Sequence, residues 1–105
     1  MASGEIAVDK LHDDHMCFAL RDIQPRAPKH LLIIPKRHVP SANELTDDDG
    51  VLLACMFAAA RKLAADEGLA ERGYRLTFNV GAEGGQTIYH LHLHLLGGRQ
   101  LGPEG

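Results

Sequence analysis

The sequence predicts one α+β domain, in which an antiparallel sheet of about five strands packs with one long helix and a short helical turn. Three observations support this fold class. The chain has 105 residues, which is the length of a single domain. Short apolar runs of strand type stand on both sides of one long helical segment. The order of strands, helix and strands is typical of α+β domains.

The first third of the chain predicts a hairpin. After a loose start over residues 1–4, Glu5–Lys10 and His15–Arg21 are expected to form weak strands. Asp13 and Asp14 between them favour a hairpin turn.

A loop and a third strand are expected next. Prolines at both ends of Pro25–Pro28 predict the loop, because proline removes a backbone donor and extends the residue before it. His30–Ile34 is rich in branched apolar residues and ends at Pro35, so it is predicted to be a strand.

The helical part follows. Ser41–Leu45 is expected to form one helical turn. Thr46 precedes three aspartates and is a good N-cap for a helix over Asp47–Glu67, which should stop at Gly68. Within this helix, Val51–Ala60 is apolar beyond one stripe. Such a helix is usually buried on more than one side, so a second subunit is expected to cover part of it.

Two strands complete the domain. Tyr74–Val80 alternates between apolar and polar side chains, as a strand with one buried face does. Residues 81–85 are glycine-rich and predict a flexible loop. Ile88–Leu96 is predicted to be the last strand, and residues 100–105 to form a C-terminal tail.

Composition narrows the function. The formal charge of −3 disfavours a protein that coats nucleic acid or an anionic membrane. The two cysteines, Cys17 and Cys55, form no CxxC pair, and free thiols fit a reducing compartment. The first residues lack the apolar run of a signal peptide, and the longest apolar run is about half a membrane span. We therefore expect a cytoplasmic protein with no nucleic-acid or membrane partner.

The most informative segment alternates histidine with leucine. On a strand, His90, His92 and His94 would share one face, about 6–7 Å apart, while the intervening leucines enter the core. A neutral imidazole has a nucleophilic nitrogen at neutral pH. A neighbouring imidazole can hold the nucleophile's tautomer or protonate a leaving group. The spacing therefore suits three groups placed along one small substrate.

Other interpretations of this segment compete. The histidines could decorate a surface strand, although strict alternation with leucine disfavours chance. An HxH pair on a strand can chelate zinc, but no cysteine or carboxylate stands close by to complete the ligand set. An affinity tag would be terminal and contiguous, and this segment is neither.

The segment resembles the His-φ-His-φ-His-φ-φ pattern of the histidine triad (HIT) family, in its Hint-like branch. The resemblance covers roughly residues 5–99 and rests on separated motifs in the same order. They are Leu20–His38, Asn79, Gly84–His90, His90–Leu96 and Gly97–Arg99. It implies a HIT-like fold over the whole chain as one HIT domain, assembled as a two-fold homodimer through the long helix and an edge strand.

The resemblance also implies an activity. Such proteins cleave the P–N bond of purine nucleoside 5′-phosphoramidates through a nucleotidyl-histidine intermediate and release a nucleoside monophosphate such as AMP. His92 would be the nucleophile and His94 would contact the phosphoryl oxygens. His90 would support the site near the leaving group, and His30 would orient the triad. Neither a metal nor another cofactor is implied.

The same resemblance implies a nucleotide site. Asp22 would hold the ribose hydroxyls, and Leu20 and Ile23 would line the base pocket. The phosphate would lie against the side chains or backbone of four further residues, Asn79, Gly85, Gln86 and Thr87. Without the resemblance, Leu20 and Ile23 would be core residues, Asp22 a loop aspartate, and the glycines simply a turn.

Alternative functions remain on sequence alone. One is a dinucleoside polyphosphate hydrolase of the same family, which the leaving group would distinguish. Another is a nucleotide-binding module with little turnover. An unrelated metalloprotein would be indicated by stoichiometric zinc that is lost when His92 is removed.

Overall fold

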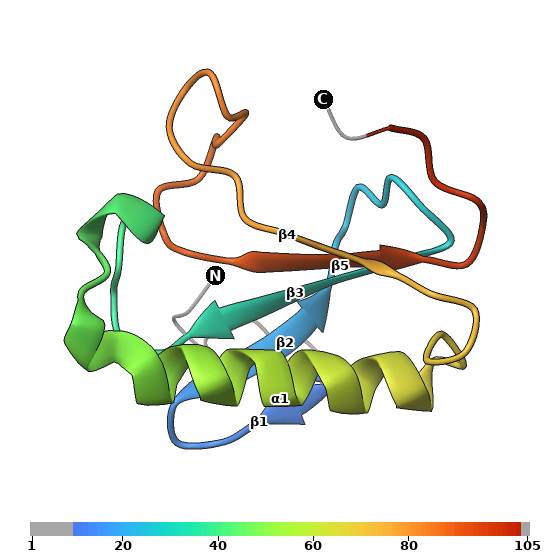
Figure 1. The fold of residues 1–105 in the computed structure, drawn as a ribbon, viewed down its shortest axis with the longest axis horizontal. Coiled ribbons are helices and arrows are strands. Elements are labelled where there is room, and N and C mark those ends of the chain that lie inside the picture. Colours follow the sequence, from blue (N-terminus) through green and yellow to red (C-terminus); the bar gives the residue numbers. More distant parts are fainter. Residues whose placement is uncertain (1–9, 104–105) are drawn as a thin grey trace.

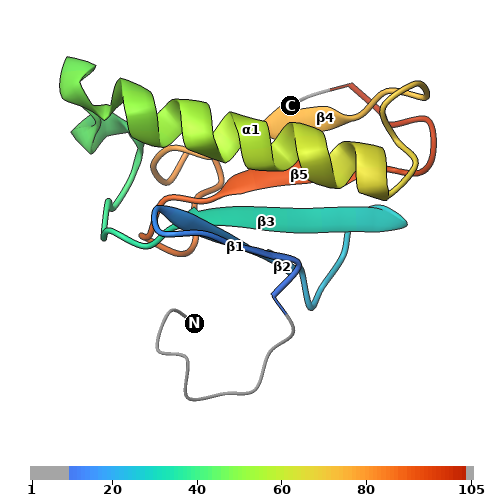
Figure 2. The ribbon, with the colours of Figure 1, turned by 90° about the horizontal axis from the view of Figure 1, so that it is seen from below.

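The computed structural model describes residues 10–103. A five-stranded antiparallel sheet forms one layer, and one long helix, α1 (Gly50–Asp66), lies across one face of it (Figures 1 and 2). The strand order is β1-β2-β3-β5-β4. The strands are β1 (His12–Asp13), β2 (Cys17–Arg21), β3 (Lys29–Pro35), β4 (Arg75–Thr77) and β5 (Leu93–Gly97). The predicted fold class is confirmed. No described helix is long and apolar enough to span a bilayer.

The hairpin turn lies slightly later than expected. Asp13 still belongs to β1, and the turn is formed by residues 14–16. Asp14 explains the difference, because its Oδ1 accepts the backbone N–H groups of Met16 at 2.7 Å and Cys17 at 2.8 Å. The strand predicted from His15 therefore begins at Cys17. The strand predicted over Glu5–Lys10 falls almost wholly outside the described residues.

The predicted N-cap is confirmed. The Thr46 side chain accepts from the Asp48 N–H, and Asp49 Oδ2 accepts the Thr46 N–H at 2.8 Å, which completes a capping box. This first turn, Asp47–Asp49, is a 3₁₀ turn, so the α-helix itself begins at Gly50. The helix ends before Gly68, whose φ of +76° suits glycine. The short turn expected before the cap is the 3₁₀ turn Ala42–Glu44.

The last two strands are shorter than predicted. Instead of Tyr74–Val80 and Ile88–Leu96, the ladder joins β4 to β5 only from Arg75↔Leu96 to Thr77↔His94. Before Leu93 the chain leaves the sheet, because the Leu91 N–H bonds to the carbonyl of Val39 in the loop after β3. Without a partner there, β4 also ends at Thr77.

The two faces of the sheet have different roles. Toward α1, strand residues such as Leu31, Ile33 and Leu95 join the buried helix residues in the main core. The predicted burial of Leu91, Leu93 and Leu95 is confirmed, since each is at most 1% exposed. On the opposite face, a smaller apolar cluster forms from Phe18, Leu20, Leu32 and Ile34. This second face is free of the helix and carries the site.

Truncating Leu95 tests the main core. Leu95 is fully buried, so Leu95→Ala should lower the free energy of unfolding by about 2–5 kcal/mol through lost burial and a cavity. Leu96→Ala is the matched control, because its side chain points to the other face and is only partly buried; its cost should be clearly smaller. Urea denaturation followed by circular dichroism measures both, and equal losses would contradict this packing.

Candidate active site

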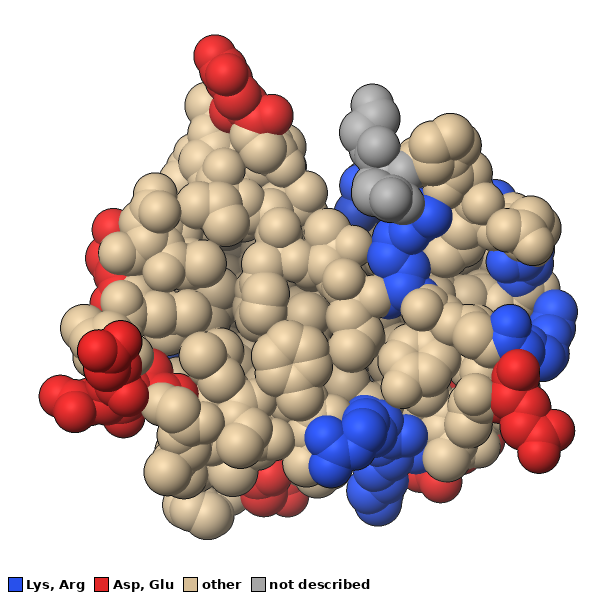
Figure 3. Space-filling view, in the orientation of Figure 1, with Lys and Arg blue, Asp and Glu red and all other residues tan. Residues whose placement is uncertain are grey.

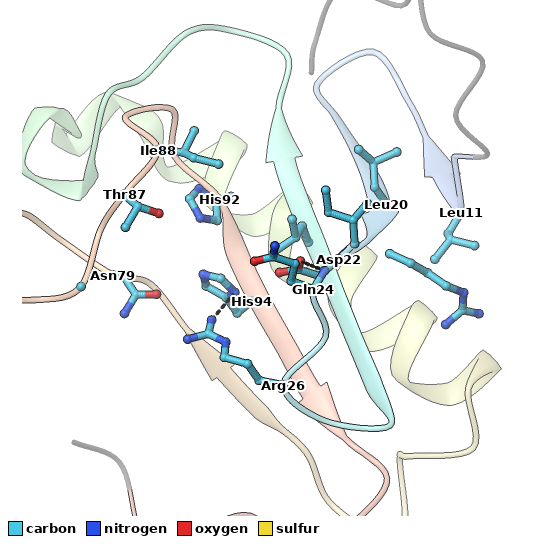
Figure 4. Close-up of a pocket in the computed structure, with 14 residues that line it drawn as sticks. Leu11, Leu20, Asp22, Gln24, Arg26, Asn79, Thr87, Ile88, His92 and His94 are labelled. Carbon is cyan, nitrogen blue, oxygen red and sulfur yellow. Dashed lines mark hydrogen bonds between the residues drawn. The ribbon is translucent and has the colours of Figure 1, made fainter.

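A cavity of about 1220 Å³ opens on the face of the sheet opposite α1 (Figure 4). The pairing of residues between neighbouring strands determines which side chains form the floor of the cavity. Leu20 pairs with Leu32, Leu32 with His94, and His94 with Thr77, so these four residues form one row across the sheet. The row passes from apolar side chains on β2 and β3 to an imidazole on β5. The floor is therefore apolar at one end and polar at the other.

The expected site residues mostly come together around this cavity. Eight of them line it, and they are His92, His94, Asp22, Ile23, Leu20, Asn79, Gly85 and Thr87. They come from β2, β5 and the loops that follow β2 and β4. Ile23 is 94% exposed and Leu20 is 8% exposed, so the apolar end of the cavity combines one exposed and one buried wall residue.

His92 and His94 lie side by side, with ring centroids 4.8 Å apart. This is closer than the expected 6–7 Å, because His92 precedes β5 and does not adopt the regular spacing of a strand. The Nδ1–H of His92 donates to the carbonyl oxygen of His90 at 2.7 Å. The proton is thereby held on Nδ1, which leaves the Nε2 lone pair of His92 available.

A chain of hydrogen bonds sets the tautomer of His94. The backbone N–H of Arg26 donates to His30 Nδ1 at 3.1 Å, so the ring proton of His30 must be on Nε2. That Nε2 lies 2.9 Å from His94 Nδ1 and donates to it. His94 consequently carries its proton on Nε2, where it is a hydrogen-bond donor. His30 thus contacts the triad directly, and its own ring is buried behind it.

Burial keeps this pair neutral. Desolvation, together with the neighbouring His92, His30 and Arg26, lowers the pKa of His94 to about 4. Burial also lowers the pKa of His30, although the Asp22 carboxylate, 3.4 Å from Nε2, acts in the opposite direction. Near pH 7 both rings are therefore uncharged, and the chain of single donors and acceptors is complete.

Three expected site residues, His30, Gln86 and His90, lie outside the cavity lining. Gln86 was expected to offer side-chain donors to a phosphate, but its Nε2 donates to the carbonyls of Pro40 and Ile88, and its Oε1 accepts the Gly81 N–H. The side chain is buried and ties the loop together. Gln86 therefore has no free donor, and its contribution is to hold the loop that carries Gly85 and Thr87.

His90 also differs from the expectation. It does not share a strand face with His92 and His94, because the chain before Leu93 is not part of the sheet. Its Nε2–H donates to the Pro35 carbonyl at 2.9 Å, and its Nδ1 lies 3.2 Å from Nδ1 of His38. His90 contributes to the site through its carbonyl oxygen, which accepts the hydrogen bond from the Nδ1–H of His92.

Several lining residues were not predicted. They are Leu11, Arg21, Gln24, Arg26, Leu32 and Ile88. Leu32 could have been found, because it alternates with His30 on a strand. Arg26 gave no signal, since an arginine between two prolines is typical of an ordinary solvent-exposed loop.

Within residues 10–103, two groups of side chains could offer ligands to a metal ion, with ligand atoms within 4.8 Å of one another. They are Asp22 with His30 and His94, and His12 with Asp14 and Cys17. In the first group, both His30 nitrogens and His94 Nδ1 already take part in hydrogen bonds. In the second, burial raises the thiol pKa of Cys17 to about 11. A metal would have to break the first network or displace the Cys17 proton.

Comparisons with known proteins identify the family of the chain. The HIT domain family matches residues 3–101. The chain is 48% identical over 99 residues to the purine nucleoside phosphoramidase of Escherichia coli K12, which covers 94% of this chain and 83% of that protein. A crystal structure of a HIT family hydrolase from Legionella pneumophila superposes with a TM-score of 0.92 at 56% identity, over 95% of this chain and 89% of the other. A histidine triad nucleotide-binding protein from Candida albicans gives 0.78 at 30% identity, over 97% and 80%.

The neutral histidine pair makes stability depend on pH. In the unfolded chain an imidazole has a pKa near 6.5, so it gains a proton on acidification while folded His94 does not. The free energy of unfolding should therefore fall by about 2 kcal/mol between about pH 7.5 and pH 5, as His94 alone requires. Urea unfolding at both pH values measures this loss.

The variant His94→Gln is the control for that experiment, because its side chain does not titrate. In this variant the free energy of unfolding should fall less between the two pH values, by about the 2 kcal/mol assigned to His94. The fall that remains includes the contribution of His30. An identical pH dependence in wild type and variant would show that His94 is not held neutral by the fold.

Proposed function

The chain belongs to the HIT family as one of its hydrolases, and on that premise we propose that it cleaves nucleoside 5′-phosphoramidates at the P–N bond. The proposed product is a nucleoside monophosphate such as AMP. One observation carries this proposal. His92, whose Nε2 lone pair is available, and His94, whose Nε2–H is a donor, line the same cavity. A nucleophile and a donor for phosphoryl oxygens are the two groups that attack at phosphorus requires.

The reaction has two balanced steps. His92 Nε2 attacks the α-phosphorus, a P–Nε2 bond forms, and the P–N bond to the amine breaks. The electron pair goes to the amine nitrogen, which takes up a proton from solvent water as it leaves. A water molecule then attacks the same phosphorus and gives up one proton to solvent. The P–Nε2 bond breaks with its electron pair returning to Nε2, which restores His92 and releases the monophosphate. In both steps the Nε2–H of His94 donates to a phosphoryl oxygen.

The remaining lining fits a nucleoside. Asp22 N–H donates to the His30 carbonyl at 2.9 Å, which fixes the carboxylate at the rim, and Asp22 Oδ1 accepts the Gln24 N–H. Its free acceptor positions suit the two hydroxyls of a ribose. Leu20 and Ile23 beside it offer an apolar surface to a base. Asn79 and Gly85 lie at the histidine end, where Asn79 Nδ2 donates to the Gly84 carbonyl.

His92 is tested by substitution. His92→Ala should lower kcat/KM for a fluorogenic adenosine 5′-phosphoramidate by at least about a thousand-fold, because no other side chain replaces a lost nucleophile. His15→Ala is the matched control, since His15 is exposed and lies outside the cavity. Chelator is present throughout. Rapid acid-free quenching should also trap the nucleotide on the wild-type protein through a base-stable, acid-labile P–N bond.

Three outcomes would contradict the proposal. One is residual activity in His92→Ala near that of His15→Ala. Another is turnover by the wild-type protein that appears only when the chelator is left out. The third is cleavage of a dinucleoside polyphosphate without cleavage of the phosphoramidate, which would assign the chain to the other hydrolase class of the family.

We propose further that the active protein is a homodimer that pairs through α1 and the edge strand β4. On the helix, Val51 is 68% exposed and Phe57 is 36% exposed, although both are apolar. Phe57 packs edge-on against Phe78, with ring centroids 6.3 Å apart, which joins the helix surface to the segment after β4. Figure 3 shows this face largely uncharged at its centre, with charged side chains at its margins. Such a surface is typical of subunit contacts.

Placing a charge on this surface tests the dimer. Wild-type protein should sediment at about twice its chain mass of 11.4 kDa, and Phe57→Asp should sediment as a monomer, because a carboxylate would be buried without a partner. Ala65→Asp, which adds the same charge at an exposed position near the helix end, is the control. Sedimentation velocity measures all three, and a monomeric wild-type protein would contradict the proposal.

A further inference from the structure

One guanidinium lines the cavity without a carboxylate partner in the described part of the chain. Arg26 extends from the loop between β2 and β3 toward His94, and its Nη2 lies 3.5 Å from His94 Nδ1 (Figure 4). Among residues 10–103, no acidic side chain forms an ion pair with Arg26. Arg21 is the contrast, because it lines the same cavity but both of its terminal nitrogens bond to Glu67, at 2.9 and 3.0 Å. The charge of Arg26 is therefore available to a ligand.

The backbone of Arg26 is fixed on both sides. Its N–H donates to the buried His30 ring, and its carbonyl accepts from Arg99 Nη2 at 2.9 Å. The side chain therefore starts from a defined position, although it is itself exposed. Its contact with His94 is long, and His94 Nδ1 already accepts from His30 at 2.9 Å. Turning the guanidinium away from His94 toward a nearby oxygen consequently costs little.

The distribution of charge in the cavity decides what Arg26 can bind. Asp22 is the one carboxylate among the described lining residues. It lies between Leu20 and His94 (Figure 4), with a carboxylate oxygen within 4.8 Å of a ring nitrogen of His94. Arg26, His94 and His92 occupy the part of the lining away from Leu20. An anionic ligand that carries an apolar group and hydroxyls is complementary to this arrangement, with its anion against Arg26 and His94.

We propose that Arg26 is a further catalytic residue, whose guanidinium donates to a non-bridging oxygen of the nucleotide α-phosphoryl group while His92 attacks. This inference rests on the proposed function. Guanidinium groups form strong, charge-assisted hydrogen bonds to phosphoryl oxygens. A fixed cation beside the phosphorus also stabilises the negative charge of the transition state. Arg26 then supplies positive charge that the neutral rings of His30 and His94 do not.

The test separates phosphate binding from binding of the nucleoside. AMP and adenosine are titrated by calorimetry into wild type, Arg26→Gln and Arg26→Lys. In Arg26→Gln, affinity for AMP should fall about ten- to hundred-fold, while affinity for adenosine stays within about two-fold. Arg26→Lys should recover part of the loss, because it keeps the charge without the planar fork. Lys62→Gln, on the far side of α1, removes an exposed charge as a control and should change neither.

Kinetics complete the test. In Arg26→Gln, kcat for the phosphoramidate should fall by about ten- to thousand-fold, as removal of one donor to a reacting oxygen does. Equal weakening of AMP and adenosine would mean that Arg26 acts only on the shape of the cavity, and unchanged AMP affinity and kcat would mean that it does not touch the phosphate; either result overturns the inference.

The failure of the proposed function looks different. If wild type hydrolyses the phosphoramidate but Arg26→Gln behaves like wild type, only the role of Arg26 fails. If wild type binds AMP through Arg26 but does not turn over, the hydrolase proposal fails and the contact stands. If wild type binds neither AMP nor adenosine, both are overturned.

Discussion

The site depends on one buried contact, the hydrogen bond between the His30 and His94 rings. His30 Nε2 and His94 Nδ1 lie 2.9 Å apart in a buried place. They can form a hydrogen bond between neutral rings only if one nitrogen carries a proton and the other does not. The Arg26 N–H fixes the first ring, and that ring fixes the second. Because burial disfavours the charged forms, the fold removes the uncertainty in proton position that a solvent-exposed histidine would retain. A separate bond to the His90 carbonyl does the same for His92.

The sheet makes this arrangement possible because one of its faces packs against α1 and the other lines the cavity. On β5, His94 stands between Leu93 and Leu95, so these two leucines pack under α1 while His94 emerges on the free face. β3 repeats the pattern, with Leu31 and Ile33 in the core and His30 on the opposite face. His30 and His94 therefore each stand on a strand whose other side is tightly packed in the core. This packing holds their positions without any contact from the helix.

How much the sequence could predict differs between the sheet and the loops. Periodicity predicted the helix and its cap at Thr46, the strand of His30, and the burial of the alternating leucines, because each depends on neighbours in the chain. The late start of β5 at Leu93 depends on a hydrogen bond from the Leu91 N–H to the Val39 carbonyl, which no local pattern contains. The same limit applies to Gln86, Arg26 and the ring of His90. Each contacts a residue 46 to 68 positions away, which is Pro40 for Gln86, His94 for Arg26 and Pro35 for His90.

The central claim is that the fold assigns one proton to each histidine of the site, and nitrogen-15 NMR of the imidazole rings tests it most directly. At pH 7.5 the chemical shifts should place the proton of His92 on Nδ1 and the protons of His30 and His94 on Nε2, with both members of the buried pair uncharged. Nitrogen shifts that place the His92 proton on Nε2, or that show His94 as a doubly protonated cation, would contradict the account.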